Sequence, residues 1–155
     1  MKPQLQLATL PGSALSRKQR IAIIELINRA YEEDLTALFQ SFTYATHVLG
    51  TVGPTLVSHA LWITRWLQIN GGPMLRTAYI ELVATNEVWR RRGFAAAVMA
   101  RVTEEIQEFD IGALSPFSVD YYTRLGWELW QGPLLIRKAG ELLPTLEDEE
   151  VTTAN

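Results

Sequence analysis

The chain has 155 residues, which is enough for one domain with a buried core, and we expect residues 1–155 to form that single domain. The formal net charge of −3 provides no basic field that would attract nucleic acid, and the absence of cysteine excludes disulfides and thiolate metal sites. The first residues, MKPQLQLATLPGS, lack the long apolar core of a secretion signal, and no apolar run is long enough to span a bilayer. We therefore expect a cytoplasmic protein that binds neither nucleic acid nor membranes.

The first half of the chain predicts one strand, two helices and a meander. Residues 4–10 are typical of a strand. Residues 15–31 predict a helix, because Ser16 and Gln19 have the spacing of a capping box and apolar residues then recur at helical spacing. Residues 32–42 predict a second, shorter helix. The pattern then changes to that of strands, and the turn signals VGP and NGGP indicate an antiparallel meander of residues 46–51, 55–66 and 74–84.

A helix is predicted over residues 92–109, because one apolar stripe runs along it: Phe94, Val98, Val102, Ile106 and Phe109. Three arginines and a glycine, residues 90–93, join this helix to the preceding strand. A helix start exposes unpaired N–H groups and the positive end of the helix dipole. Gly93 allows close backbone approach, and the arginines add forked donors. This segment predicts capture of a phosphate-bearing ligand by backbone amides, with a solvated basic turn as the alternative.

The remaining residues predict a short buried strand at 111–115, a helix and further strands. Ser115 can cap that helix with Pro116 at its first position, and Gly126 can end it in a left-handed conformation. WELW and LLIRK are strand candidates, and the acidic residues 147–150 predict a solvated tail. The order β-α-α-β-β-β-α-β-α-β predicts an α+β fold, with helices flanking a mixed, largely antiparallel central sheet.

Two motifs connect this layout to a known family. VATNEVWRRRGFA resembles the acetyl-CoA motif of the GNAT acetyltransferases, in which a strand leads into R/Q-x-x-G-x-G/A at a helix start. YYTRLGWELW is similar to the family's Y-x-x-x-G-F/W. The residues that match are Arg90, Gly93 and Ala95 in the first motif and Tyr122, Gly126 and Trp127 in the second. The resemblance implies a GNAT fold and an enzyme that moves acetyl from acetyl-CoA to a primary amine by direct attack in a ternary complex, without a metal.

A narrower resemblance concerns the acceptor. AYEEDL, YIELVA, GALS, YYTRLGW and WQGP are similar to segments of the aminoglycoside 2′-N-acetyltransferases, which implies an aminoglycoside-type or other small cationic amine. The chain departs from that subfamily in TALFQS, which lacks the further acidic residue those enzymes carry there. A peptide N-terminal acetyltransferase and a non-catalytic acyl-CoA-binding sensor are the alternative functions. The acceptor, the acyl chain length and the choice between monomer and homodimer stay open.

Three side chains are candidates for chemistry or substrate binding. Strand alternation places Glu81 and Val83 on one face of an apolar strand and Ile80 and Leu82 on the other. A carboxylate in such a strand is costly unless it faces water or a partner. The subfamily resemblance implies that Glu81 is the base that deprotonates the amine, and a solvent-facing glutamate is the alternative. The GNAT resemblance implies that Tyr122 protonates the leaving thiolate, and packing is the alternative for Tyr122. Asp34 matches a substrate-contacting acid, and Glu81 is a second substrate-binding candidate.

Backbone groups complete the predicted site. The N–H of Val83 is the candidate donor to the oxyanion that forms when the amine attacks. His47 and His59 lie in strand segments without nearby acid clusters, and we therefore predict no metal site. The resemblance assigns acetyl-CoA binding to Leu82, Val83, Ala84, Arg90, Arg91, Arg92, Gly93, Phe94, Ala95 and Ser115.

Overall fold

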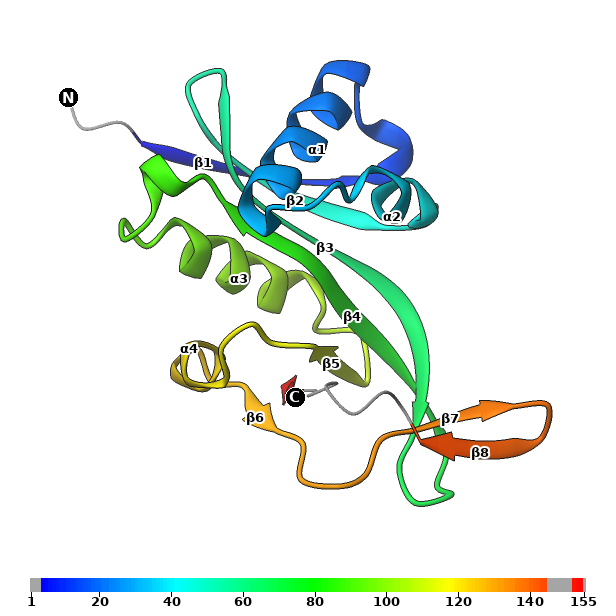
Figure 1. Cartoon of the computed structure of the whole chain (residues 1–155). Coiled ribbons are helices and arrows are strands. Elements are labelled where there is room, and N and C mark those ends of the chain that lie inside the picture. The colour runs from blue at the N-terminus through cyan, green and yellow to red at the C-terminus, as the bar shows by residue number, and fades with distance from the viewer. Residues whose placement is uncertain (1–3, 145–151, 155) are drawn as a thin grey trace.

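The computed structural model describes residues 4–144 and 152–154. A seven-stranded sheet in the order β1-β2-β3-β4-β5-β9-β6 forms the centre of the molecule, and β7 and β8 form a separate hairpin (Figure 1). The strands are β1 (Leu5–Pro11), β2 (Thr46–Val52), β3 (Thr55–Gln68), β4 (Met74–Thr85), β5 (Ile111–Leu114), β6 (Glu128–Leu129), β7 (Leu135–Lys138), β8 (Glu141–Pro144) and β9 (Thr152–Ala154). The helices are α1 (Arg17–Tyr31), α2 (Thr36–Ser41), α3 (Phe94–Glu105) and α4 (Val119–Arg124), with single 3₁₀ turns at Gly12–Ala14 and Glu87–Trp89.

The predicted α+β fold and the predicted element order are confirmed as far as β6, and β7, β8 and β9 follow. Strands β1 to β4 pair antiparallel, as the meander prediction requires. Strand β5 pairs parallel with β4, so the chain must cross over between them, and α3 makes that crossover. Strand β9 pairs antiparallel with both β5 and β6 and completes the sheet. The predicted acidic tail at residues 147–150 lies outside the described residues.

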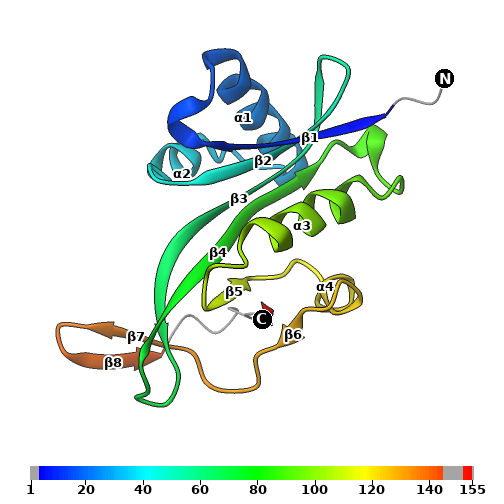
Figure 2. The same cartoon turned by 180° about the vertical axis from the view of Figure 1, so that it is seen from behind.

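Helices cover both faces of the sheet, and each face has its own core (Figure 2). The helices α1 and α2 pack on one face, where the core includes Ile23, Ile27, Phe39, Leu49, Leu61 and Leu82. The helices α3 and α4 pack on the other face, with Trp62, Ile80, Val98, Met99, Val102 and Tyr122. The predicted capping box is present, because Ser16 Oγ accepts from the Gln19 N–H and Gln19 Oε1 accepts from the Ser16 N–H. Within the described residues, no helix is long and apolar enough to cross a membrane.

The helix predicted over residues 92–109 is shorter in the structure. Gly93 has a left-handed φ of 78° and is the N-cap residue of α3, so Arg92 lies before the helix. The helix ends at Glu105, and a turn closed by the Phe109 N–H and the Ile106 carbonyl follows. The predicted stripe still faces the core, because Val98, Val102 and Ile106 are buried.

The predicted cap of α4 is wrong. Ser118, not Ser115, is the N-cap residue, and its Oγ accepts from the Tyr121 N–H at 3.3 Å. The ring centroid of Phe117 lies 5.6 Å from that of Tyr122, in the arrangement of a hydrophobic staple that starts the helix at Val119. Gly126, at φ 95°, follows the helix end as predicted.

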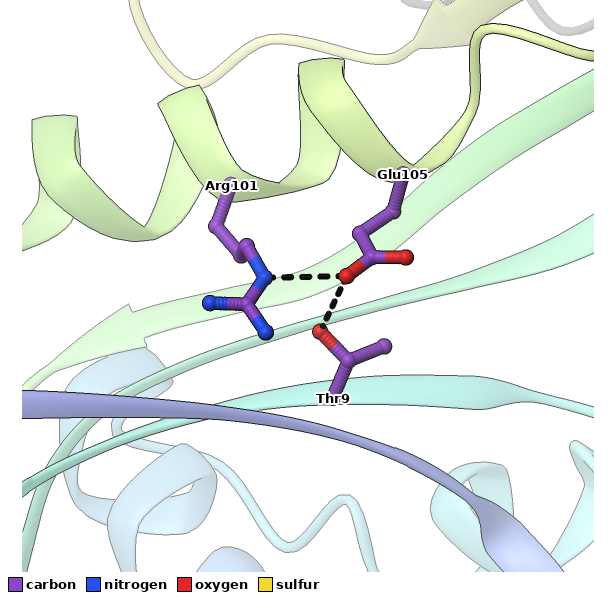
Figure 3. A network of polar contacts seen from close by, with 3 residues as sticks. All are labelled: Thr9, Arg101 and Glu105. Atoms are coloured by element: carbon purple, nitrogen blue, oxygen red, sulfur yellow. Dashed lines mark hydrogen bonds and ion pairs between the residues drawn. The ribbon is translucent and has the colours of Figure 1, made fainter.

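A polar network fixes α3 against the far edge of the sheet. Glu105 Oε1 accepts from Arg101 Nε at 2.9 Å and from Thr9 Oγ1 of β1 at 3.0 Å (Figure 3). The hydrogen bonds from Arg101 and Thr9 lower the pKa of Glu105. Beside the network lies a hollow of about 320 Å³, which Arg76 and Glu108 also line. Its lining residues Glu105 and Glu108 place it at the C-terminal end of α3. The N-terminal end of the helix lies by the end of β4 (Figure 1).

Candidate active site

The strands β4 and β5 separate where the predicted site residues begin. Their parallel pairing runs from Thr77 with Ile111 to Ile80 with Leu114, and β4 then continues to Thr85. Among the described residues, no strand pairs with this edge of β4 beyond Ile80. The backbone of residues 81–85 therefore presents an open strand edge, which is a surface that an extended ligand can pair with.

A β-bulge shapes the same part of β4. Glu81 pairs with Leu61 and Ala84 pairs with His59, so Leu82 and Val83 together face a single residue of β3. Leu82 has a φ of 52°, in the left-handed region that costs a residue other than glycine about 1–3 kcal/mol. Such bulges redirect side chains and occur next to active sites. Glu81 keeps the α1 face that regular alternation from Ile80 gives it, and the bulge brings Leu82 to that face too and Val83 to the α3 face. The predicted alternation, with Val83 beside Glu81 and Leu82 beside Ile80, is therefore wrong.

Glu81 lies at the rim of this site. Its Oε1 is 3.8 Å from Arg65 Nη2, and the Glu81 side chain is 28% exposed. The guanidinium of Arg65 in turn lies 4.2 Å above the ring of Tyr79. The carboxylate is thus open to water on the α1 face and has a cation beside it, at the point where β4 and β5 part.

Tyr31 belongs to the site although the sequence does not single it out. It is the last residue of α1, and its hydroxyl donates to the Val83 carbonyl at 3.0 Å. Burial and the charge of Glu81 raise the pKa of Tyr31 to about 12. The phenol therefore keeps its proton at neutral pH and fixes one side of the bulge to α1.

Tyr122 lies in the core on the α3 face and is 2% exposed. Its ring packs edge-on against Tyr121, with centroids 5.1 Å apart, and against Trp127 at 6.4 Å. Burial raises the pKa of Tyr122 above its ordinary value, and the nearby phenols of Tyr31 and Tyr121 raise it further. Tyr121 is only partly buried, but its hydroxyl is buried and has no hydrogen-bond partner within the described residues.

The arginine turn precedes α3 in an exposed loop. Arg91 and Gly93 both have left-handed backbones, with φ of 62° and 78°, and no side chain caps the helix. Arg90 Nε donates to the Thr85 carbonyl at 3.3 Å, and Arg92 lies over the Trp89 ring. The first N–H groups of α3 therefore have no side-chain cap, and three exposed arginines precede them in the chain.

Asp34 has a local structural role. Its Oδ1 accepts from the Thr36 N–H at 3.0 Å and from Thr36 Oγ1 at 2.6 Å, at the start of α2. These hydrogen bonds lower the pKa of Asp34. Asp34 lies in the loop that follows Tyr31, with Glu32 and Glu33 before it, so this acidic loop begins at the end of α1 that reaches β4.

A model of the family described as an acetyltransferase (GNAT) domain matches residues 14–130. The chain belongs to the GNAT acetyltransferase family. An aminoglycoside 2′-N-acetyltransferase of Mycolicibacterium fortuitum is 30% identical over 142 residues, which cover 89% of this chain and 72% of that protein. The family assigns acetyl transfer to the chain, and the fold described above is the GNAT fold.

Solved structures agree on the fold. An acyl-CoA N-acyltransferase from Pseudomonas aeruginosa has a TM-score of 0.67 at 13% identity, with 98% of this chain and all of that chain (100%) covered. Eis1 from Mycobacterium abscessus has a TM-score of 0.69 at 20% identity, with 81% of this chain covered. This chain spans only 31% of the length of Eis1 and 33% of the length of a probable N-acyltransferase from Enterococcus faecalis V583.

The GNAT fold brings most of the predicted residues to one end of β4. Glu81 to Ala84 form the bulge, the arginine turn follows, and Ser115 lies just after β5, the other arm of the split. Asp34 instead has Thr36 as its immediate partner. Sequence reasoning missed Tyr31 and His59, whose contacts to Val83 and Leu82 span 52 and 23 residues. No local pattern marks such contacts, because Tyr31 continues the apolar stripe of α1 and His59 lies within a strand.

The Tyr31 hydroxyl gives a prediction that has a defined pH dependence. At neutral pH, Tyr31→Phe should lower the free energy of unfolding by about 1 kcal/mol, because it removes the hydrogen bond to Val83. The folded-state pKa is raised from 10.0 to about 12, so the unfolded chain loses this proton first. The stabilisation should therefore be complete below pH 10.0 and shrink as the pH rises towards about 12.

Urea unfolding of wild type and Tyr31→Phe on either side of pH 10.0 measures this difference in the free energy of unfolding. Tyr44→Phe is the control, because the Tyr44 ring is 95% exposed. A constant difference across that range would contradict the assignment.

Proposed function

We propose that the chain transfers acetyl from acetyl-CoA to a primary amine, by direct attack of the amine in a ternary complex. The observation that carries this proposal is the open edge of β4 at residues 81–85, which leads from the partly exposed Glu81 carboxylate to an uncapped helix start. A strand edge suits the extended, amide-containing arm of CoA, and a helix start suits its pyrophosphate. When bound, acetyl-CoA would supply an activated acetyl thioester.

The residues that would hold acetyl-CoA lie along one path. The N–H groups of residues 91–95 would bind the pyrophosphate, with the guanidinium groups of Arg90 to Arg92 around it. The backbone of Leu82 to Ala84 would pair with the pantetheine arm, and Ser115 lies at the end of the opposite strand. The Val83 N–H would donate to the oxyanion, since the bulge frees this part of the backbone from the regular ladder.

Proton transfer would involve two side chains on opposite faces of the sheet. An alkyl amine is mostly protonated at neutral pH and must lose a proton before it attacks. Glu81, which is partly exposed on the α1 face, would accept this proton directly or through a water molecule. Tyr122, whose raised pKa keeps it protonated, would donate its proton to the departing sulfur. No cysteine nucleophile is needed for direct attack, and the sequence contains none.

A small cationic amine is the acceptor class that we favour, with aminoglycosides included. The relative from M. fortuitum carries an aminoglycoside in its name, and the acidic loop of Glu32, Glu33 and Asp34 would attract a cation. CoA release with a panel of aminoglycosides, polyamines and peptide N-termini would test this. A non-catalytic acyl-CoA sensor is the second candidate, because Tyr122 lies in the core and its ring packing gives it a structural role in any case. Acetyl-CoA binding without CoA release would favour the sensor.

We expect Gly93→Val to weaken acetyl-CoA binding by about tenfold or more, since valine strains the left-handed backbone that orients the first N–H groups of α3. Gly53→Val is the matched control. Gly53 also has a positive φ, at 57°, and an added side chain meets nothing within 4 Å at either position, but Gly53 lies in the remote β2–β3 turn. Calorimetry with acetyl-CoA measures both variants. Equal affinities in the two would move the phosphate site elsewhere.

Tyr122→Phe should keep the ring packing and acetyl-CoA affinity but lower kcat by about 10²–10⁴-fold, the range typical of general acid catalysis. The control is Tyr121→Phe, which removes a neighbouring buried hydroxyl that has no partner within the described residues. Steady-state and single-turnover rates should be measured together, so that slow product release does not hide the chemical step. Equal rates in both variants and wild type would leave Tyr122 with a packing role.

Glu81→Gln keeps the size of the side chain and removes its basicity. If Glu81 is the base, the loss of rate should be greatest at low pH, where the amine is most protonated, and should shrink as the pH approaches the pKa of the amine. If Glu81 only attracts the cation, KM should rise and the effect should weaken with salt. Glu104→Gln, an exposed carboxylate of α3, is the control for the same change in net charge. If wild type and Glu81→Gln have parallel pH–rate profiles and the same KM, Glu81 has no role in the mechanism.

A further inference from the structure

The two histidines of the chain meet in the core beneath the β4 bulge. His47 Nδ1 and His59 Nε2 are 2.9 Å apart, and His59 Nδ1 is 2.8 Å from the Leu82 carbonyl oxygen. His59 is fully buried and His47 is 2% exposed. This pair lies outside the predicted chemistry, and no group of three metal-ligating side chains exists among the described residues to make it a metal site.

The contacts define the position of each proton. A carbonyl oxygen only accepts, so His59 Nδ1 must carry the hydrogen that it donates to Leu82. In a neutral ring His59 Nε2 is then an acceptor, so His47 Nδ1 must donate to it. Burial lowers the pKa of His59 to about 3, and burial together with the Arg20 charge lowers that of His47 to about 4. Both rings are therefore neutral at neutral pH, as these two hydrogen bonds require.

We propose that His59, supported by His47, is a positioning residue that holds the Leu82 carbonyl and thereby sets the geometry of the bulge next to Glu81. The inference rests on the proposed function, since it concerns the same backbone edge. Leu82 has an unfavourable φ of 52°, and its carbonyl accepts a hydrogen bond from the His59 ring of β3. The His59 ring is held in turn by the hydrogen bond from His47 of β2. On the other side of the bulge, the Tyr31 hydroxyl holds the Val83 carbonyl at 3.0 Å. The two successive carbonyls of the bulge are thus each fixed by a buried or half-buried side chain.

A histidine pair with only a structural role would need hydrogen-bond partners for its ring nitrogens, but those partners could lie anywhere in the core. Here the His59 Nδ1–H group donates to Leu82, which is the one non-glycine residue of β4 with a positive φ. Leu82 lies in the chain between the candidate base Glu81 and the candidate oxyanion donor Val83. A shift of about 1 Å at such a position can cost about a hundredfold in rate. The positioning role therefore predicts an effect on kcat that exceeds the effect on acetyl-CoA affinity. The pyrophosphate site lies beyond the end of β4, so the bulge would contact only the pantetheine arm of the cosubstrate.

Two substitutions separate the contacts of His59. His59→Asn keeps a donor near the place of Nδ1, towards Leu82, and loses the atom that faces His47. His59→Gln keeps a polar group near the place of Nε2, towards His47, and loses the Leu82 donor. We expect the Gln variant to lose about a hundredfold in kcat and the Asn variant to retain most of it, with similar acetyl-CoA affinities in both. The control is Ser58→Ala, which removes buried hydrogen bonds to Ala84 and Thr85 just beyond the bulge and should leave kcat unchanged.

The wild-type protein offers a test that needs no substitution. The chain contains only two histidines, so ¹⁵N-histidine labelling gives signals from these two rings alone. NMR should find the proton on Nδ1 of both rings, and acetyl-CoA should shift the His59 Nδ1 signal more than that of His47. A proton on Nε2 of His59 would overturn the proposal even if both variants fail to fold.

The outcomes distinguish this inference from the proposed function. If wild type releases CoA but folded His59→Gln retains its kcat, or loses no more than His59→Asn, the positioning role is wrong and the proposed function stands. If wild type binds acetyl-CoA but releases no CoA with any amine of the panel, the transferase proposal fails and the positioning role in catalysis fails with it. Comparable melting temperatures of the variants show that the kcat difference does not arise from unfolding.

Discussion

The left-handed backbone of Leu82 is the constraint on which the rest of the site depends. Because two residues of β4 face one residue of β3, side chains on the two sides of the bulge no longer follow a single alternation. Glu81 and Leu82 consequently share the α1 face, and Val83 lies on the α3 face. A regular strand would direct Glu81 and Leu82 to opposite faces and would keep the Val83 backbone within the ladder. The strained residue thus sets the position of the candidate oxyanion donor relative to the candidate base.

The crossover from β4 to β5 explains why the open edge and the anion site lie together. A parallel neighbour requires a long connection, and α3 provides it, starting just after β4 and returning the chain to β5. The short β5 pairs with β4 only as far as Ile80 and Leu114, so the last residues of β4 face the space by the start of α3. The helix start and the unpaired edge are therefore two results of the same connection, and a single extended ligand can contact both.

The sequence predicted what local patterns encode. Hydrophobic periodicity located the meander and α3, the capping box located the start of α1, and two short motifs indicated the GNAT family. The start of α4 was misplaced, because two serines were available and the contact of Phe117 with Tyr122 selects Ser118. The bulge could not be predicted, since leucine rarely adopts a positive φ and nothing in YIELVA marks one. Tyr31 and His59 reach the bulge from distant elements, so only the tertiary fold reveals them.

Stability explains how the strained residue persists. A left-handed leucine costs about 1–3 kcal/mol, and burying its side chain stabilises the fold by about 1.5–3 kcal/mol. The hydrogen bonds from His59 and Tyr31 contribute about 0.5–1.5 kcal/mol each, so the two carbonyl contacts together are of the same size as the strain. Burial of Leu82 alone would favour the strand without selecting this backbone conformation, because an ordinary strand residue can also direct its side chain into the core. The two carbonyl contacts are specific to the bulged form, and the conformation of the edge therefore depends on side chains that need never touch a ligand.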